Sequence, residues 1–395
     1  MDAGRRAERF PVGASATVEQ LEGDPHALLA RLREREPVSW LPALEGWLVT
    51  RRDLALQVMR DPGTFTVDDE RFSTGQLVGP SMLTRDGAEH RRHRDPFAGP
   101  FRRDAVRERF TGFVADETAR LIGEIRPAGR AELRRSLAGP LAVAVVARAL
   151  GLRDADASTV LGWYDEIVMA VTDITAGRLP GAAGHAAYAA LSATIERGLD
   201  GDPAASLLAA AAGAAGGLER DRVVSNAAVL LFGGIETTEG MIANAVWHLL
   251  SWPDELARVR ASPDLLANAV EESLRLEPAA AIVDRYATAD VELAGASIRR
   301  GELVRVSIAA ANRDPAAFED PDRFDVRRAN AHRHLAFAHG PHTCIAMHLA
   351  RLEAHTAVDQ LLRRLPGLRL DPVTPAAPRG LVFRKPPELG VLWSP

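Results

Sequence analysis

Residues His334–Arg351 read HLAFAHGPHTCIAMHLAR, and Cys344 at their centre is the only cysteine among 395 residues. A single cysteine cannot form a disulfide within the chain. Gly340 and Pro341 interrupt any helix before it, and the apolar spacing after it predicts a helix. Unpaired N–H groups and the positive end of that helix would stabilise a thiolate. The stretch indicates a reactive or metal-binding thiolate, and a buried, inert cysteine is the alternative.

A second stretch, Arg222–Trp252, is apolar enough for a buried helix but carries GGIETT at residues 233–238. Each glycine inside a helix costs about 1 kcal/mol relative to alanine. A buried acid and hydroxyl are costly without partners. Such local violations are expected at functional sites, where Glu236 can act in a proton relay. The alternative is a kinked helix whose polar groups face solvent.

Two spacings favour ionic contacts. Asp86 is a plausible N-cap, with Glu89 at the spacing of a capping box. His90 and Arg94 are four residues apart, so they share a helix face and could clamp an anion. A solvated basic face is the alternative.

The segment Asn268–Pro278 places Glu272 and Arg275 three residues apart, where an ion pair forms readily. The alternative is an ordinary surface salt bridge worth ~0–1 kcal/mol.

Composition places the chain among globular proteins, with 47% hydrophobic and 26% charged residues. The net charge of −5 gives no polyanion-binding character, so we expect no nucleic-acid partner. The charged start lacks the apolar core of a signal peptide, and no uncharged run is long enough for a membrane span. We expect a monomeric cytoplasmic protein that binds no membrane, with roughly its first 20 residues flexible.

The expected elements are mostly helices. Pro37–Thr50 alternates like a β-hairpin with Glu45–Gly46 as its turn, and Thr64–Thr84 reads as a long irregular loop. Short strands are expected at Val291–Leu293, Ala296–Ile298 and Leu303–Ile308. Helices are expected at Arg52–Asp61, Arg102–Ile125, Ala138–Leu152, Ser158–Thr175 and Gly184–Gly198.

The cysteine stretch resembles a known family. Phe337-x-x-Gly340-x-His342-x-Cys344 is similar to the haem-ligand loop of the cytochrome P-450 family, the haem-thiolate monooxygenases. Ala338 and Ala346 stand where that family commonly has glycine. Residues 233–238 resemble the family's oxygen-activation helix, and Glu272-x-x-Arg275 precedes the cysteine loop in the family's order. The resemblance extends from about Pro37 to Trp393.

The resemblance implies a single domain over residues 1–395, the mainly α triangular prism with a small β-rich region. It implies heme b (iron protoporphyrin IX) with Cys344 as axial ligand, and Glu236 and Thr237 as catalytic residues. The further haem contacts would be Phe337, Gly340, His342, His90, Arg94 and Arg285. The substrate cavity would include Met82, Leu83, Phe232, Gly233, Ala281, Ile282 and Val283. Glu272 and Arg275 would lock to Arg323 as a structural group, and the remaining histidines, His334 among them, would be surface or packing residues.

The function implied is a bacterial monooxygenase that inserts one oxygen atom from O2 into a small apolar substrate in secondary metabolism. No G-x-G-x-x-G unit for a nucleotide cofactor is present, so electrons would come from a ferredoxin and a ferredoxin reductase. One alternative is a peroxide-dependent haem peroxygenase, which would turn over with peroxide but not with reductant and O2. The other is a non-catalytic haem sensor or carrier, which would oxidise no ligand that shifts its haem spectrum.

Overall fold

The fold is known from a computed structural model, which describes residues 3–152, 157–175, 179, 181–199, 207–213, 218–374 and 377–394. The chain divides into two compact units. Unit 1 consists of Met1–Thr66, Gly240–Cys344 and Leu365–Ser394. Unit 2 consists of Val67–Glu239, Ile345–Arg364 and Pro395.

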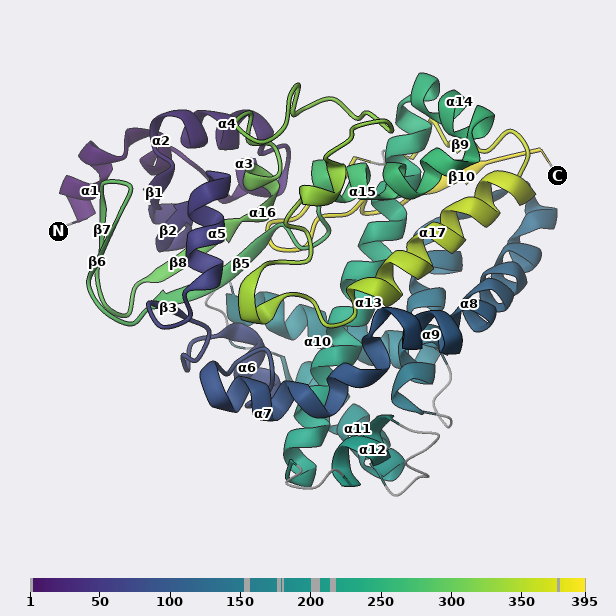
Figure 1. Ribbon diagram of the computed structural model, residues 1–395, viewed down its shortest axis with the longest axis horizontal. Coiled ribbons are helices and arrows are strands. Elements are labelled where there is room, and N and C mark those ends of the chain that lie inside the picture. The colour runs from purple at the N-terminus through teal and green to yellow at the C-terminus, as the bar shows by residue number, and fades with distance from the viewer. Residues whose placement is uncertain are drawn as a thin grey trace. The chain divides into compact units, whose positions relative to one another are not determined.

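Unit 1 contains a five-stranded sheet in the order β1-β2-β8-β5-β3 (Figure 1). The strands β2 and β8 pair in parallel, and the other neighbours pair antiparallel. Glu45 adopts a left-handed φ of 48° before β2, which closes the predicted hairpin turn. The strands are β1 (Val38–Leu41), β2 (Gly46–Val49), β3 (Phe65–Thr66), β5 (Ile282–Ala287) and β8 (Leu303–Ser307).

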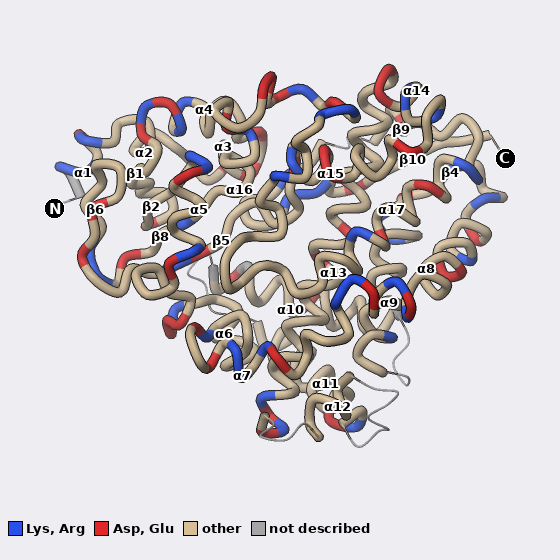
Figure 2. The backbone as a smooth tube through the Cα atoms, viewed as in Figure 1, with Lys and Arg blue, Asp and Glu red and all other residues tan. Residues whose placement is uncertain are grey.

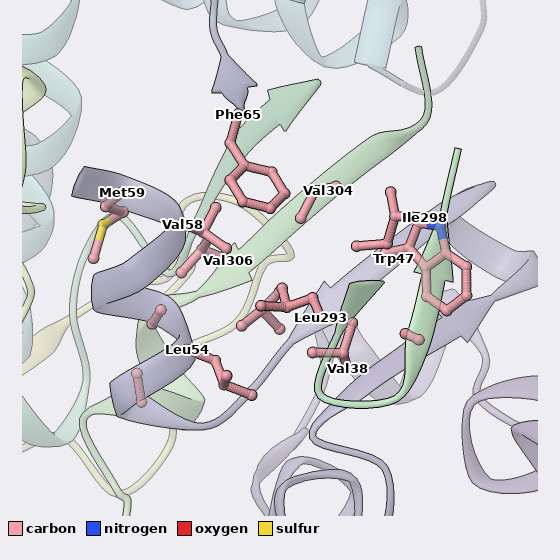
Figure 3. Packing of buried hydrophobic residues seen from close by; sticks show 14 of the residues in the cluster. Val38, Trp47, Leu54, Val58, Met59, Phe65, Leu293, Ile298, Val304 and Val306 are labelled. Carbon is pink, nitrogen blue, oxygen red and sulfur yellow. The ribbon is translucent and has the colours of Figure 1, made fainter. Parts of the chain in front are cut away.

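Helix α5 (Arg52–Arg60) packs its apolar face on this sheet (Figure 3). Val58 and Met59 from the helix join Trp47, Phe65 and Val306 in one buried cluster. Burying each such side chain is worth about 1.5–3 kcal/mol. This cluster fixes the helix end that carries Met59.

The N-terminal residues begin with two short helices. Residues Ala3–Arg9 and Pro11–Ala14 form helices α1 and α2. Phe10 between them is buried, with its ring 5.3 Å from that of Trp47. Packing of this aromatic side chain anchors the point where α1 meets α2.

The rest of unit 1 consists of short elements. The predicted pair of short strands is present as β6 (Val291–Leu293) and β7 (Ala296–Ile298), which pair antiparallel. Strands β9 (Arg369–Leu370) and β10 (Gly390–Leu392) also pair antiparallel. The remaining helices are α3 (Val18–Glu22), α4 (His26–Arg35), α14 (Pro253–Ala261), α15 (Leu266–Leu276) and α16 (Ile308–Ala311), with single turns η1 (Pro42–Leu44), η5 (Pro263–Leu265), η6 (Ala331–Arg333) and η7 (Gly340–His342).

Unit 2 is built mainly of helices. Its elements are α6 (Ser73–Val78), α7 (Gly87–Ala98), η2 (Gly99–Phe101), α8 (Arg103–Ile125), η3 (Arg126–Ala128), β4 (Arg130–Glu132), η4 (Arg134–Ala138), α9 (Gly139–Leu150), α10 (Ala157–Thr175), α11 (Ala182–Leu199), α12 (Leu207–Gly213) and α17 (Met347–Arg364). Helix α13 (Arg220–Ser251) contributes its first part, through Glu239, to this unit. Helix α17 lies beside α8 in Figure 1, and Gln360 Nε2 donates 2.9 Å to the Ala115 carbonyl across that contact. Figure 2 shows both signs of charge along α8, where Arg120 pairs with Glu117.

Two local predictions in unit 2 were wrong. The stretch expected to be an irregular loop contains helix α6. Asp86 stands at the N-cap position of α7, but its side chain forms no cap and accepts the Val67 N–H at 2.9 Å instead.

No helix among the described residues is both long enough and apolar enough to cross a bilayer.

Candidate functional site

Cys344 ends a tightly folded loop in unit 1. Its N–H donates 2.9 Å to the Phe337 carbonyl, which closes the loop on itself. The Gly340 carbonyl accepts from the N–H of Thr343 at 3.1 Å and from its hydroxyl at 2.8 Å. The thiol itself is half-buried. Backbone hydrogen bonds thus define where the sulfur sits.

Two residues of this loop have left-handed backbones. Gly340 has a φ of +77°, and a Cβ there would lie 2.4 Å from the Met59 carbonyl oxygen, so only glycine fits. Ala338 has a φ of +56°. A left-handed residue other than glycine costs roughly 1–2 kcal/mol, which explains why glycine is common at this position in the resembled family. Alanine is accommodated here at that cost.

The surroundings of the thiol fit haem. Ala336, Phe337 and Ala338 are all partly exposed, although Leu335 just before them is buried. Partly exposed apolar groups beside a half-buried thiol form a surface that a flat, apolar ligand bonded to sulfur would cover. The Cys344 sulfur would then bind the ligand, and the Phe337 side chain would lie against its apolar surface.

The Glu272–Arg275 pair is fully buried in α15. Arg275 Nε donates 2.7 Å to Glu272, and both side chains are 0% exposed. The second arginine that binds Glu272 is Arg328, at 2.8 Å, and not Arg323 as predicted. Arg323 is exposed, and its carbonyl oxygen accepts from Arg275 and Arg328. The chain turns between Arg323 and Arg328, and this turn brings the later arginine to the glutamate.

Three predicted cavity residues lie at the start of strand β5 and differ in burial. Ala281 and Ile282 pack in a core cluster with Leu28 and are 1% and 7% exposed. Val283, on the opposite face from Ile282 because strand side chains alternate, is partly exposed.

Of the predicted haem contacts in unit 1, Arg285 is buried rather than an exposed strand arginine. Its guanidinium donates 2.7 Å to the Asp284 carbonyl. Burial raises the pKa of the Asp284 carboxyl, against the opposing charges of Arg305 and Arg285. His342 lies in η7 and is partly exposed.

In unit 2, one face of helix α13 is partly exposed beside two glycines. From Val223 to Glu239 the only residues that are not buried are Gly233, Gly234 and Thr237. A Cβ at Gly233 would meet nothing within 4 Å, whereas one at Gly234 would press on Val146 at 3.2 Å. The Thr237 hydroxyl donates 2.6 Å to the Gly233 carbonyl. The open space therefore lies beside Gly233, and Thr237 is one turn away on the same face.

The neighbours of this opening on α13 are buried. Glu236 is 4% exposed, and Phe232 packs with its ring centre 6.4 Å from that of Tyr164 in α10. Glu239 is fully buried and paired with Arg134 at 3.0 Å. This pair holds the helix at the end of its polar stretch, and sequence reasoning did not find it.

Helix α7 shows two faces. His90 is buried and Arg94 is partly buried, whereas Arg91 and Arg92 are exposed. His93 is also buried, and its Nδ1 lies 2.8 Å from the Asn226 side chain. Burial lowers the pKa of His93, although the hydrogen bond with Asn226 acts in the opposite direction. Helix α7 therefore carries both the predicted anion-binding pair, His90 and Arg94, and a histidine, His93, that packs inside unit 2.

The two cavity residues before α7 differ in burial. Met82 is buried, and its N–H donates 2.7 Å to Asn226 Oδ1. Leu83 is partly exposed. Asn226 on α13 therefore fixes the position of this segment.

Comparison with known proteins gives the family. The profile of the family described as Cytochrome P450 matches residues 201–388. Cytochrome P450 monooxygenase PikC of Streptomyces venezuelae is 38% identical over 362 residues, covering 88% of this chain and 85% of that protein. The chain belongs to the cytochrome P450 family.

Other P450 relatives agree. Mycinamicin IV hydroxylase/epoxidase of Micromonospora griseorubida is 35% identical over 379 residues, covering 92% of this chain and 94% of that protein. The crystal structure of P450BioI in complex with hexadec-9Z-enoic acid ligated acyl carrier protein has a TM-score of 0.85 at 28% identity, covering 95% of this chain and 100% of that one. These likenesses confirm the predicted fold class.

Membership defines the general activity. The protein is an oxidoreductase, a haem-thiolate P450 monooxygenase of a family that uses O2, a substrate and redox partners. The family's cofactor is haem bound through a cysteine thiolate.

Proposed function

We propose that Cys344 is the axial ligand of heme b in this P450. The observation that carries the proposal is the loop itself: the only cysteine of the chain is half-buried at its end, and its N–H is bound to the Phe337 carbonyl. Bound haem would supply the redox-active iron at which O2 is activated, with electron donation from the thiolate favouring O–O cleavage.

The cationic side chains predicted as haem contacts would bind the two propionates. Arg285 is buried in β5, and His90 is buried in α7, so each could offer a charge or hydrogen bond in a low-dielectric setting. Arg94 and His342 would complete the set from partly exposed positions.

Proton handling would fall to Glu236 and Thr237. Because the Thr237 hydroxyl donates to the Gly233 carbonyl, its oxygen lone pairs are oriented to accept a hydrogen bond from the open side of the helix. Glu236 is the adjacent buried acid and would carry protons inward through water. Gly233 leaves room for O2 and substrate.

The substrate would be a small apolar compound that is hydroxylated or epoxidised in bacterial secondary metabolism. Support comes from relatives whose names describe such reactions, mycinamicin IV hydroxylase/epoxidase and 20-oxo-5-O-mycaminosyltylactone 23-monooxygenase. Val283, Leu83 and Gly233 are the partly exposed cavity candidates, and none is charged. The reaction outcome depends on pocket shape.

The electrons would come from a ferredoxin and its reductase. Arg91, Arg92, Arg102 and Arg103 are all exposed on α7 and at the start of α8, and they would attract an acidic ferredoxin. Asp95 and Asp104 stand among them and reduce the net charge.

The ligand assignment is tested with Cys344→Ser. The reduced, carbon monoxide-treated parent should show the thiolate-type Soret band, and the variant should lose it or bind no haem. Thr237→Ala serves as the control, because that residue is no ligand and the band should persist. A parent-like band in Cys344→Ser would refute the assignment.

A further inference from the structure

His334, at the start of the cysteine loop, is a buried histidine that accepts a hydrogen bond at Nδ1 and has Nε2 within ion-pair distance of a glutamate. Its side chain is 1% exposed, and Nε2 lies 3.2 Å from Oε2 of Glu271. The Ala336 N–H donates 3.1 Å to Nδ1. Because Nδ1 accepts a hydrogen bond, the proton of the neutral ring sits on Nε2 and faces the carboxylate. The Nδ1 hydrogen bond defines the tautomer of the neutral ring, and the short distance from Nε2 to the carboxylate places a charge beside it.

His334 is connected to Cys344 through Phe337. Its ring lies 5.8 Å from that of Phe337, and the Phe337 carbonyl accepts the Cys344 N–H at 2.9 Å. One aromatic ring and one peptide group therefore separate His334 from the cysteine. The Leu335 N–H donates 2.7 Å to Asn312 Oδ1, which holds the same segment from a second direction.

The other end of the contact is a rigid helix. Glu271 lies in α15 directly before Glu272, whose carboxylate is buried between Arg275 and Arg328. The Glu271 side chain is 15% exposed, so it keeps access to water and bears its charge at modest cost. The two adjacent glutamates therefore have different contacts. Glu272 binds the arginines that hold the helix, and Glu271 contacts His334 in the cysteine loop.

We propose that Glu271 and His334 form a carboxylate–histidine pair that positions the cysteine loop and thereby tunes the reduction potential of the haem iron. This inference rests on the proposed ligation by Cys344. A carboxylate makes the ring a stronger acceptor for the Ala336 N–H, which orients the peptides leading to Phe337. The geometry and hydrogen bonding around a ligating sulfur set the potential of its metal. Both residues act through the loop and are positioning residues.

The test compares Glu271→Gln, His334→Asn and the double variant in the full-length haem-loaded protein. Asparagine can still accept the Ala336 N–H but cannot reach Glu271, and glutamine removes the charge of Glu271 without changing its size. Each single variant should raise the midpoint potential of substrate-free protein, because weaker electron donation by sulfur favours the ferrous state. The double variant should shift it no further than the larger single shift, since both remove one contact.

Matched controls are His332→Asn, an exposed histidine two residues earlier, and Glu292→Gln, an exposed glutamate in β6. Both should keep the parent's potential and Soret position. If His334→Asn does not hold haem, Glu271→Gln decides alone, because its size is unchanged.

Potentials of Glu271→Gln and His334→Asn equal to those of the controls would overturn the inference, as would fully additive shifts. A parent without the thiolate-type Soret band would instead refute the ligation by Cys344, so the two failures are distinguishable.

Discussion

Glu353 in α17 is a buried carboxyl group, 4% exposed, whose Oε2 finds no hydrogen-bond partner among the described residues. Burial raises its pKa well above the ordinary value of 4.5. The folded protein therefore favours the protonated acid. Its contribution to stability is present below pH 4.5 and is lost as the pH rises through the raised pKa.

Glu353→Gln should stabilise the protein at neutral pH. An amide needs no proton from solvent, so the variant avoids the cost of protonating the buried acid, which is about 1.4 kcal/mol for each pH unit between 4.5 and the raised pKa. Urea unfolding at several pH values measures the difference between the two proteins. We expect it to be near zero at acidic pH and to grow towards neutrality, and the exposed Glu108→Gln should show no such trend. An equal urea midpoint for both proteins at neutral pH would contradict the interpretation.

At the scale of elements, helix α15 is held by one buried carboxylate and two arginines. Arg328 also donates to the Glu319, Asp320 and Arg323 carbonyls, so it joins the irregular segment after α16 to the helix. Without Arg328, Glu272 keeps its ion pair with Arg275, but the three carbonyls lose a donor, and a buried polar group left unsatisfied costs about 1–3 kcal/mol.

Arg328→Met should therefore lower the free energy of unfolding by about 1–3 kcal/mol. Arg323→Met is the matched control, because that side chain is exposed and should change stability by at most about 0.5 kcal/mol. Chemical denaturation of both variants gives the comparison. The opposite order, with Arg323→Met the more damaging, would restore the partner predicted from sequence.

The sequence predicted those elements whose signals are local. The β1–β2 hairpin, β6, β7 and the two chemical stretches carry turn residues or broken periodicity that can be read from neighbours. Arg323 and Arg328 could not be told apart, because the choice depends on how an irregular segment turns. His334 was missed for a similar reason, since its partner Glu271 is 63 residues earlier in the chain and no local pattern links them.

At the scale of the molecule, two buried groups with large pKa shifts contribute to the loss of stability in acid. Burial lowers the pKa of His248 to about 3 from 6.5. Burial of Glu277 would by itself raise its pKa, but the hydrogen bond with His26 and the charge of Arg384 lower it to about 2 from 4.5. In both cases the unfolded chain binds a proton that the folded chain does not, so stability falls as the pH falls.

The parent should lose about 1.4 kcal/mol of stability per pH unit through His248 as the pH falls below 6.5. Glu277 should add a second proton to this slope below pH 4.5. His248→Asn should flatten the slope between pH 6 and 5, whereas the exposed His332→Asn should leave it unchanged. Urea midpoints measured across this range test the expectation, and an identical slope in parent and His248→Asn would rule out the histidine as its source.

Neither compact unit is a continuous piece of chain, and this bears on how the protein is made. Unit 1 needs Leu365–Ser394 to be complete, and unit 2 needs Ile345–Arg364. Synthesis proceeds from the N-terminus, so both units wait for the last tenth or so of the polypeptide to leave the ribosome. Until then helix α13 lacks the Arg384 carbonyl, which accepts from Asn244 at 3.0 Å, and a nascent chain stalled early leaves both units incomplete.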